Sequence, residues 1–582
     1  MSEPLRIANC SGFYGDRLSA AREMVDGGPI DVLTGDWLAE LTMLVLAKNM
    51  LRDPALGYAR TFVQQMEQVM GNCLDRGIKV VSNAGGLSPQ RCAQAVAEVA
   101  DRLGLAPVIA YIEGDDLTGR LAELRAAGME FRNADTGEPL GDQQVITANA
   151  YLGGWGIAAA LARGADIVIT GRVTDAALTC GPAAWHHGWQ RDDWDALAGA
   201  VVAGHVIECG AQVTGGNFAF FTEVPGLEHP GFPIAEVARD GTAVITKHPG
   251  HGGAVTVDTV TAQLLYEIGG PAYLNPDVTA RFDSIQLSAA GPDRVRIAGV
   301  RGESPPATAK VALNYTGGWR STLTLYLTGL DIEAKAALVE RALWAGVPGG
   351  RDAFDEVDVS LLRTDKDDPA TNAEAMAQLR ITVKDRDEHK VGRAFAARVT
   401  ELALASYPGM FGGAPAGAQA FGVYWPVNVP ASVVCQDVWV SGEKTVVEPV
   451  LPPGPAVVAD VTGAAARTVP DGPMARVPLG RVAGARSGDK GGNANLGVWG
   501  RTDEAYAWLA GFLTVERLKE LLPETAPLPV QRYELPNLRA LNFVITGLLG
   551  EGVAASTRLD PQAKSLGEWL RARVVDVPAG LL

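Results

Sequence analysis

Residues 166–182 read Asp-Ile-Val-Ile-Thr-Gly-Arg-Val-Thr-Asp-Ala-Ala-Leu-Thr-Cys-Gly-Pro and join an apolar run to a polar turn. The run Ile-Val-Ile is typical of a strand that is covered on both faces. Gly171 interrupts the run, and Arg172, Thr174 and Asp175 follow it. A helix is expected to begin near Thr174 or Asp175, since either side chain can cap it. We therefore predict a cation, a hydroxyl and a carboxylate at the carboxyl end of one strand, where open parallel sheets bind ligands.

Five earlier stretches have the same design, a short strand that ends in small or polar residues. These strands are expected at 5–10, 30–33, 78–81, 108–112 and 145–147. Alternating strands and helices predict an α/β fold whose sheet is mostly parallel and doubly wound, as in Rossmann-like folds. Eight clean strand–helix units are not found, which disfavours a barrel. Right-handed crossovers then bring all six carboxyl ends to one edge of the sheet.

The polar residues and glycines at these strand ends are the candidate site. The residues expected to bind substrate are Asn9, Ser11, Gly12, Asp36, Asn83, Gly85, Gly86, Asn149, Arg172 and Thr174. The acid/base candidates are Glu113, Asp115 and Asp175, because carboxyl groups can transfer protons during a reaction. The alternative is that some of these residues only form turns, since Asn, Asp and Gly are what turns require. In that alternative Asp175 only caps a helix and Arg172 only pairs with it.

Motifs for common cofactors are missing from the sequence. No G-x-G-x-x-G follows the first strand and no Walker A motif occurs, so neither a dinucleotide nor a P-loop nucleotide is expected. The six cysteines are scattered without a C-x-x-C pair, which gives no support for a zinc ribbon. His248 and His251 are three residues apart, but no third ligand lies nearby, and a turn is preferred. We expect no metal site.

Composition narrows the classes of partner. With 582 residues, 47% of them hydrophobic and 20% charged, the chain is expected to fold into several packed domains. The net charge of −17 argues against nucleic acid and against an anionic membrane surface. A small anionic substrate fits only where Arg or Lys residues gather. The first residues lack the apolar core of a signal peptide, and no uncharged run is long enough to span a bilayer, so we expect a cytoplasmic protein.

The rest of the chain divides into further parts. We predict an α/β domain over 1–225, an α+β domain over 226–450, a Pro-, Ala- and Gly-rich linker over 451–475 and a small α+β domain over 476–582. The small domain contains a glycine-rich turn at 486–495, between predicted strands, with five polar residues that are also candidates to bind substrate: Ser487, Asp489, Lys490, Asn493 and Asn495. Glycines there let backbone amides and an ammonium approach an anion. The alternative is a hairpin with a solvated lysine.

Three long motifs together resemble the acyclic terpene utilisation family, AtuA. They are Ile-Val-Ile-Thr-Gly-Arg-Val-Thr-Asp-Ala-Ala-Leu at 167–178, Val-Ser-Asn-Ala-Gly-Gly-Leu-Ser-Pro at 81–89 and Arg-Ser-Gly-Asp-Lys-Gly-Gly-Asn-Ala-Asn-Leu-Gly at 486–497. The resemblance covers nearly the whole chain. It implies that the part up to about residue 450 is the family's N-terminal region and that the tail is a ferredoxin-like domain. It also implies a role in the breakdown of branched and terpenoid acids as CoA thioesters, but it carries over no catalytic residues.

Two hypotheses of function follow. In the first, the protein is an enzyme that adds or removes water on a branched or terpenoid acyl-CoA or a related carboxylate. Such a lyase needs an acid/base group and an anchor for an oxygen, and coenzyme A enters only as part of the substrate. In the second, the protein is a non-catalytic accessory or scaffold subunit that works with acyl-CoA carboxylase pathway proteins. Many apolar positions in an acidic chain lead us to expect a homo-oligomer in either case.

Overall fold

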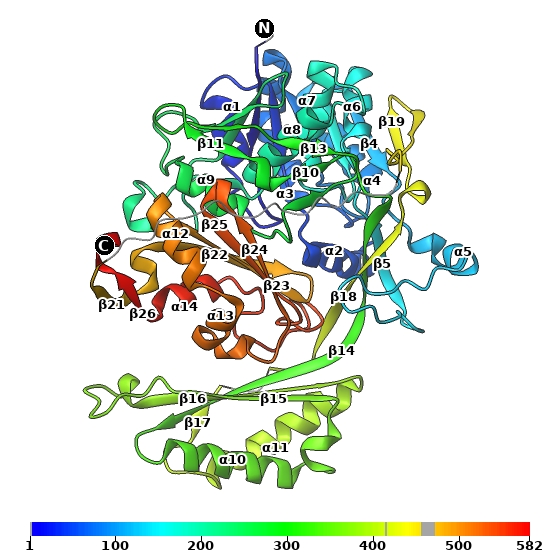
Figure 1. Cartoon of the computed structure of the whole chain (residues 1–582). Helices are drawn as coiled ribbons and strands as arrows, with labels where there is room; N and C mark the ends of the chain where they lie inside the picture. Colours follow the sequence, from blue (N-terminus) through cyan, green and yellow to red (C-terminus); the bar gives the residue numbers. More distant parts are fainter. Residues whose placement is uncertain (1–2, 414–415, 455–471) are drawn as a thin grey trace. The chain divides into compact units, whose positions relative to one another are not determined.

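A computed structural model describes residues 3–413, 416–454 and 472–582 (Figure 1). The chain forms two compact units. Unit 1 comprises Met1–Asn314, Tyr424–Val553 and Asp560–Leu582, and unit 2 comprises Tyr315–Val423 and Ala554–Leu559. The candidate site described below lies within unit 1.

The main sheet of unit 1 is mixed. Its centre consists of five parallel strands in the order β1 (Leu5–Asn9), β2 (Val32–Gly35), β3 (Lys79–Ser82), β6 (Ile167–Thr170) and β4 (Ile109–Glu113). Antiparallel strands extend both edges: β7 (Pro233–Val237), β8 (Ala243–Lys247), β12 (Val295–Ala298) and β11 (Gln286–Ala289) beside β1, and β19 (Gln436–Val440) and β20 (Glu443–Val447) beside β4. The predicted parallel sheet therefore describes the centre of this sheet and not its edges.

Two expectations about this sheet are corrected. The strand predicted at 145–147 is β5 (Val145–Ala150), and it pairs with β14 (Thr308–Thr328) in a different sheet. Its first two residues are partly or fully open to solvent, unlike those of a strand covered on both faces. In addition, the sheet runs through the boundary predicted at residue 225, because β7 pairs with β1 and β8 pairs with β7.

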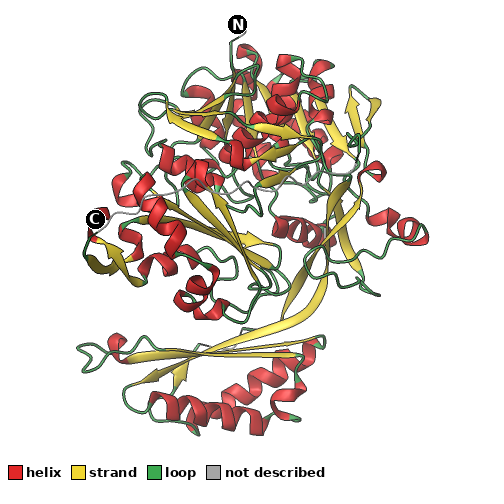
Figure 2. Ribbon diagram, viewed as in Figure 1, coloured by secondary structure: helices red, strands yellow, loops and turns green. Residues whose placement is uncertain are grey.

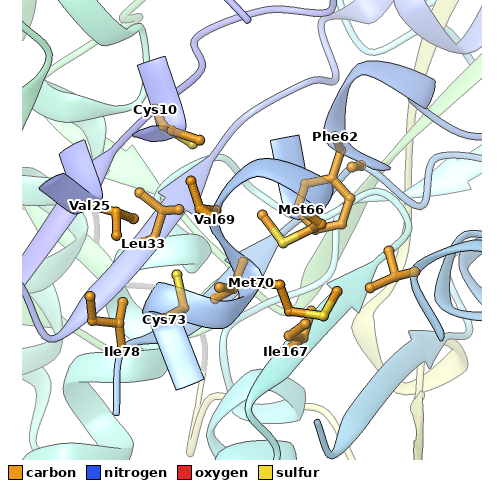
Figure 3. Close-up of a cluster of buried hydrophobic side chains, with 14 of the residues drawn as sticks. Cys10, Val25, Leu33, Phe62, Met66, Val69, Met70, Cys73, Ile78 and Ile167 are labelled. Atoms are coloured by element: carbon orange, nitrogen blue, oxygen red, sulfur yellow. The ribbon is translucent and has the colours of Figure 1, made fainter. Parts of the chain in front are cut away.

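Helices cover both faces of the parallel centre, as Figure 2 shows. One set, α1 (Ala20–Asp26), α3 (Arg60–Arg76) and α4 (Pro89–Leu103), packs on the face that carries Leu33, Val80 and Ile167. Figure 3 shows Val25, Phe62, Met66 and Ile167 gathered in this core. A second set packs on the alternate side chains of the same strands: α6 (Trp155–Ala162), α7 (Ala177–His187) and α8 (Trp194–Ile207). Burial on both faces explains why these strands are continuous apolar runs.

Shorter elements complete this part of unit 1. They are α2 (Glu40–Arg52), α5 (Leu121–Ala126), α9 (Val257–Leu264), β9 (Ala272–Leu274), β10 (Thr279–Arg281) and β13 (Arg301–Glu303). The helix after β6 begins at Ala177, and its N-cap is Ala176 rather than Thr174 or Asp175. Asp175 instead pairs with Arg172, so its carboxylate is directed toward other side chains and not toward the helix.

Unit 2 packs helices on an antiparallel sheet. The elements lying mainly in it are β15 (Glu356–Leu362), β16 (Met376–Asp385), β17 (Phe411–Gly412), α10 (Ile332–Gly346) and α11 (Phe395–Glu401), and strands β14 and β18 (Gln419–Pro430) extend into it. Its core includes Leu325, Ile381, Val339 and Phe395. The α+β domain predicted over 226–450 is therefore divided, because its flanking strands join the main sheet while 315–423 form a unit with their own core.

The C-terminal domain of unit 1 is an antiparallel sheet with three helices. Its strands lie in the order β22 (Ala483–Lys490), β23 (Asn493–Gly500), β25 (Ala540–Ile545) and β24 (Val530–Leu535). The helices are α12 (Asp503–Phe512), α13 (Val515–Leu521) and α14 (Leu566–Ala572), and β21 (Met474–Pro478) pairs with β26 (Val574–Pro578). Of the linker predicted over 451–475, residues 455–471 lie outside the described residues.

The glycine-rich stretch 486–495 is less of a turn than predicted. Strands β22 and β23 pair up to Lys490 and Asn493, so only Gly491 and Gly492 form the turn. Leu496 and Phe543 face the core of the domain, whereas Asn495 lies on the other face of the sheet because successive side chains alternate. The polar residues of this stretch are therefore held by strand pairing.

The core of unit 1 gives the first prediction. Phe62 is 1% exposed and stacks edge-on against Trp37, with ring centroids 5.2 Å apart. We expect Phe62→Ala to lower the free energy of unfolding of unit 1 by about 3–5 kcal/mol, since it removes buried surface and leaves a cavity. Chemical denaturation followed by tryptophan fluorescence measures this. Leu51→Ala, at a position that is 86% exposed, is the control and should change the value by less than about 0.5 kcal/mol. Equal effects of the two variants would contradict this packing.

Candidate active site

Amide side chains organise the carboxyl ends of the first three strands. The Nδ2 atom of Asn83 donates a hydrogen bond to Oδ1 of Asp36 (2.6 Å), and Oδ1 of Asn83 accepts one from the backbone of Trp37 (2.8 Å). After β1, Nδ2 of Asn9 donates to the carbonyl oxygen of Glu208 (3.2 Å). These three polar residues are fully or almost fully buried. They fix the loop after β2 to the end of β3 and the end of α8 to the end of β1.

Three carboxyl groups meet at this edge of the sheet. Asp36 follows β2, Asp175 follows β6 and Glu208 ends α8; one oxygen from each lies within 4.8 Å of the others. Asp36 and Glu208 are buried, whereas the Asp175 side chain keeps 29% of its exposure. Solvent therefore reaches a group of carboxyl oxygens that is otherwise enclosed. We call these three residues the carboxylate cluster.

A buried guanidinium lies beside the carboxylate cluster. Nη1 of Arg172 is 3.0 Å from Oδ1 of Asp175 and also donates to the carbonyl oxygen of Leu38. The guanidinium carbon lies 4.3 Å from the centroid of the Tyr151 ring, within the range of a cation–π interaction. Arg172 is 3% exposed, so this positive charge is held in place by its partners. The turn Gly-Arg-Val-Thr-Asp thus supplies both an anion and a cation to the site.

The charges of these residues perturb one another. Burial raises the pKa of Asp36 and of Glu208 well above the ordinary value, and the nearby carboxylate of Asp175 raises both further. Burial lowers the pKa of Arg172, but Asp175, Tyr151 and Asp36 together outweigh burial and keep this pKa well above the ordinary value. Clusters of groups with displaced pKa values are characteristic of functional sites. Burial and the neighbouring charge thus both favour the protonated forms of Asp36 and Glu208.

His205 belongs to this site although sequence reasoning missed it. It precedes Glu208 by three residues on α8, and its Nδ1 lies 3.9 Å from Oε1 of Glu208. The ring is 1% exposed, and neither nitrogen makes a well-formed hydrogen bond among the described residues, although the backbone carbonyls of Leu264 and Gln263 lie close enough to favour its charged form. It packs against the rings of Tyr273 and Phe282, at 5.0 and 5.5 Å. Burial first, and then the charge of Lys490, lower the pKa of His205 to about 4.

The C-terminal hairpin reaches the loop after α9. Nζ of Lys490 donates to the carbonyl oxygen of Glu267 (3.3 Å), and Oδ1 of Asn495 accepts from the backbone nitrogen of Glu267 (2.7 Å). Nδ2 of Asn542, on β25, donates to the carbonyl oxygens of Gly269 and Ile268. Lys490 thus acts electrostatically on His205, which is a neighbour of Glu208 in the carboxylate cluster.

The other candidate residues on the hairpin make hydrogen bonds and an ion pair with the C-terminal domain itself. Oγ of Ser487 accepts a hydrogen bond from the backbone of Gly567 (2.9 Å), and Oδ1 of Asn493 accepts one from Gly547 (2.9 Å). Asp489 forms an ion pair with Lys564 (3.3 Å). These contacts fix the hairpin in its own domain.

A separate cavity of about 630 Å³ lies at the end of β4. Its lining includes Gly86, Glu113, Asp115, Asp116, Arg120, Asn149 and Asp437. Burial, followed by the charge of Asp437, raises the pKa of Glu113. The structure thus divides the predicted acid/base residues, because Glu113 and Asp115 line this cavity while Asp175 joins the carboxylate cluster. None of the residues that line this cavity comes from 486–495.

Asp115 lies between the cavity and the cluster. Its Oδ2 accepts hydrogen bonds from Nδ2 of Asn149 (2.8 Å) and from the backbone nitrogen of Arg172 (2.9 Å). Burial raises the pKa of Asp115 to about 7, although these hydrogen bonds favour the charged form. This carboxyl group is therefore positioned to hold the Arg172 turn and to change its charge near neutral pH.

The remaining candidates shape the turns. Ser11 Oγ donates to the carbonyl oxygen of Phe13 (3.0 Å), and Oγ1 of Thr174 is 3.5 Å from the carbonyl oxygen of Leu152. A Cβ on Gly12 would lie 2.5 Å from the backbone of Cys209, and one on Gly85 would lie 2.5 Å from the carbonyl oxygen of Thr170. Glycine is required there because two backbone segments approach closely. Nε2 of His248 lies 2.9 Å from the carbonyl oxygen of Met24, in agreement with the preference for a turn over a metal ligand at this position.

Comparison with protein families identifies the chain. A family model described as acyclic terpene utilisation family protein AtuA matches residues 5–440. This chain belongs to the AtuA family. The model for the AtuA ferredoxin-like domain matches residues 477–576, and the resemblance seen in the sequence is confirmed for both parts. A comparison with curated proteins finds no match. The family is implicated in acyclic terpene utilisation, which is consistent with a catabolic role.

The described part of this AtuA protein contains no helix with both the length and the apolar character that a membrane crossing needs.

Asp115 gives a pH-dependent prediction for the AtuA chain. Its folded pKa is raised, so its contribution to stability is complete below the unfolded pKa near 4 and is lost as the pH rises toward about 7. Asp115→Asn keeps an oxygen acceptor without titrating. We expect the wild-type free energy of unfolding to fall relative to this variant by roughly 4 kcal/mol between about pH 4 and pH 7. Urea denaturation of both proteins across this range measures the difference. If the difference in the free energy of unfolding did not vary with pH, the pKa of Asp115 in the folded protein would not be raised.

Proposed function

We propose that this AtuA family protein is a catabolic enzyme that adds or removes water on a branched or terpenoid acyl-CoA or a related carboxylate. The observation that carries the proposal is the carboxylate cluster of Asp36, Asp175 and Glu208 beside the guanidinium of Arg172. It lies at the carboxyl edge of the parallel strands, where α/β sheets bind ligands. Carboxyl groups and a fixed cation together can both move a proton and hold an oxygen anion.

The reaction balances without an oxidant or reductant. Addition of water to a double bond conjugated with an acyl carbonyl breaks one O–H bond and the π bond. It forms a C–O bond at the β-carbon and a C–H bond at the α-carbon, and removal of water is the reverse. The cluster would take the proton of water, and Arg172 would stabilise the negative charge that develops on the carbonyl oxygen. The step needs a carboxylate that accepts a proton and a fixed cation that stabilises the oxygen anion in the transition state.

The cavity at the end of β4 supports this chemistry less well. Its lining carries the carboxyl groups of Glu113, Asp115, Asp116 and Asp437 against one guanidinium, that of Arg120. Nη1 of Arg120 donates to the carbonyl oxygen of Val433 (2.8 Å). Arg120 also pairs with Glu123, which does not line the cavity, whereas Arg172 pairs directly with a carboxylate of the cluster. The carboxylate cluster is therefore the better centre for the proposed reaction.

Asp175→Asn tests the reaction most simply. Asp175 is the most exposed member of the cluster and Asn is isosteric with it, and circular dichroism verifies that the variant is folded, because the change removes the ion-pair partner of the buried Arg172. We expect turnover of branched enoyl-CoA or 3-hydroxyacyl-CoA substrates, followed by chromatography of the thioesters, to fall by about 10²–10⁴-fold. Asp75→Asn, on the exposed face of α3, is the matched control and should retain wild-type turnover. Full activity in Asp175→Asn would contradict a role of the carboxylate cluster in the reaction.

The scaffold alternative predicts different results with the same protein. A small-molecule site gives a ligand-specific rise in the melting temperature when acyl-CoAs or hydroxy acids are added. An accessory subunit would show no such rise, and it would co-purify with acyl-CoA carboxylase subunits. The thermal-shift screen therefore separates an enzyme from a scaffold before any rate is measured.

Lys490 tests whether the C-terminal domain takes part. Its ammonium lies near His205 and within the same unit as Arg172, so we propose that it attracts an anionic ligand. Lys490→Ala should weaken binding of an acyl-CoA measured by calorimetry, with little change in the melting temperature. Lys519→Ala, on α13, is the control.

We also propose that the protein is a homo-oligomer, and light scattering on both variants measures the size of the oligomer. Unchanged affinity with a shifted oligomer would make the domain an assembly module instead.

A further inference from the structure

We propose that Asp36, Asp175 and Glu208 bind one divalent metal ion and that His205 supplies a nitrogen donor to it. The inference rests on the proposed function in using the same site, but metal binding can be measured without turnover. It departs from the expectation, drawn from the sequence, that the chain has no metal site. The departure arises because α8, which carries two of the four donors, was not among the candidate segments.

The spacing of the oxygens supports a shared ion. Donor atoms that bind one cation at about 2.0–2.6 Å lie at most about 4–5 Å from one another. One oxygen from each of the three carboxyl groups lies within 4.8 Å of the other two. These residues come from three separate elements, the loops after β2 and β6 and the end of α8. Their convergence is therefore not a consequence of being neighbours in the sequence.

His205 is the second and independent observation. An imidazole that is 1% exposed normally makes well-formed hydrogen bonds, yet neither nitrogen of His205 makes one among the described residues, and only the backbone carbonyls of Gln263 and Leu264 lie close enough to the ring to favour its charged form. Its Nδ1 lies 3.9 Å from Oε1 of Glu208 but outside the set of donor atoms that lie within 4.8 Å of one another, so the ring would shift toward Asp36 and Asp175 to bind the same ion. The aromatic rings of Tyr273 and Phe282 pack against the imidazole and hold it in this position. A buried ring nitrogen without a well-formed hydrogen bond, beside one carboxylate of the cluster, suits a metal ligand.

Charge balance points to a divalent ion. The three carboxylates carry three negative charges when ionised, and the ion pair with Arg172 offsets one of them. Two negative charges remain, which a divalent cation would neutralise in a site where uncompensated charge is costly. Carboxylate oxygens suit Mg²⁺, Ca²⁺ and Mn²⁺, whereas imidazole suits transition metals, so Mn²⁺ is the appropriate probe for a mixed set. Such an ion would favour loss of a proton from bound water.

The experiment measures Mn²⁺ binding to the full chain after treatment with a chelator. Electron paramagnetic resonance of free Mn²⁺ gives the stoichiometry and the dissociation constant. We expect one Mn²⁺ per wild-type chain. Affinity should fall at least about tenfold in Glu208→Gln and in Asp175→Asn, and also in His205→Phe, which keeps the ring packing. Asp75→Asn should bind as the wild type does. Circular dichroism verifies that each variant is folded, and two carboxylate variants ensure that one unfolded protein does not decide the result.

Two outcomes overturn the metal site: no stoichiometric binding to the wild-type chain, or equal affinity in the carboxylate variants. Equal affinity in His205→Phe alone removes the nitrogen donor. Failure of the metal site is distinct from failure of the proposed reaction. Turnover of an acyl-CoA by a wild-type chain that binds no Mn²⁺ stoichiometrically would keep the reaction and reject the metal site. Site-specific Mn²⁺ binding without turnover of any acyl-CoA would keep the metal and reject the reaction.

Discussion

The carboxylate cluster imposes the main physical constraint on this AtuA protein. Asp36, Asp175 and Glu208 stand within 4.8 Å of one another, and two of them are buried. Carboxylates at such distances repel one another strongly where water is scarce. The fold opposes this repulsion with the guanidinium of Arg172, which is itself fixed by Asp175, Leu38 and the ring of Tyr151. Protons, or the metal ion that we propose, would supply the rest of the compensation.

The surrounding structure holds this arrangement in place. Asn83 fixes Asp36, and Asn9 fixes the end of α8 that carries Glu208. Asp115 accepts a hydrogen bond from the backbone nitrogen of Arg172 and so fixes the turn that carries it. On the C-terminal side, the hairpin of β22 and β23 orders the loop at Glu267, and the charge of Lys490 acts on His205. Residues more than three hundred positions apart thus contribute to one electrostatic environment.

The sequence predicts those residues of the candidate site that directly follow a strand. Apolar runs with polar ends predict Asn9, Asp36, Asn83 and Arg172 at one edge, because parallel strands place their carboxyl ends together. Glu208 and His205 lie at the end of a helix, so this argument did not include them. A signal was present, since a polar pair three residues apart interrupts the otherwise apolar run of α8. Strand partners that join over long range, as β5 joins β14, cannot be predicted from local pattern.

The most direct test of the account is the location of Mn²⁺ by anomalous X-ray diffraction from crystals of the full chain. The account predicts one strong peak among Asp36, Asp175 and Glu208, with oxygen distances of about 2.0–2.6 Å and a nitrogen of His205 beside it. The absence of a peak there, or a peak only in the cavity lined by Glu113 and Asp437, would contradict the account.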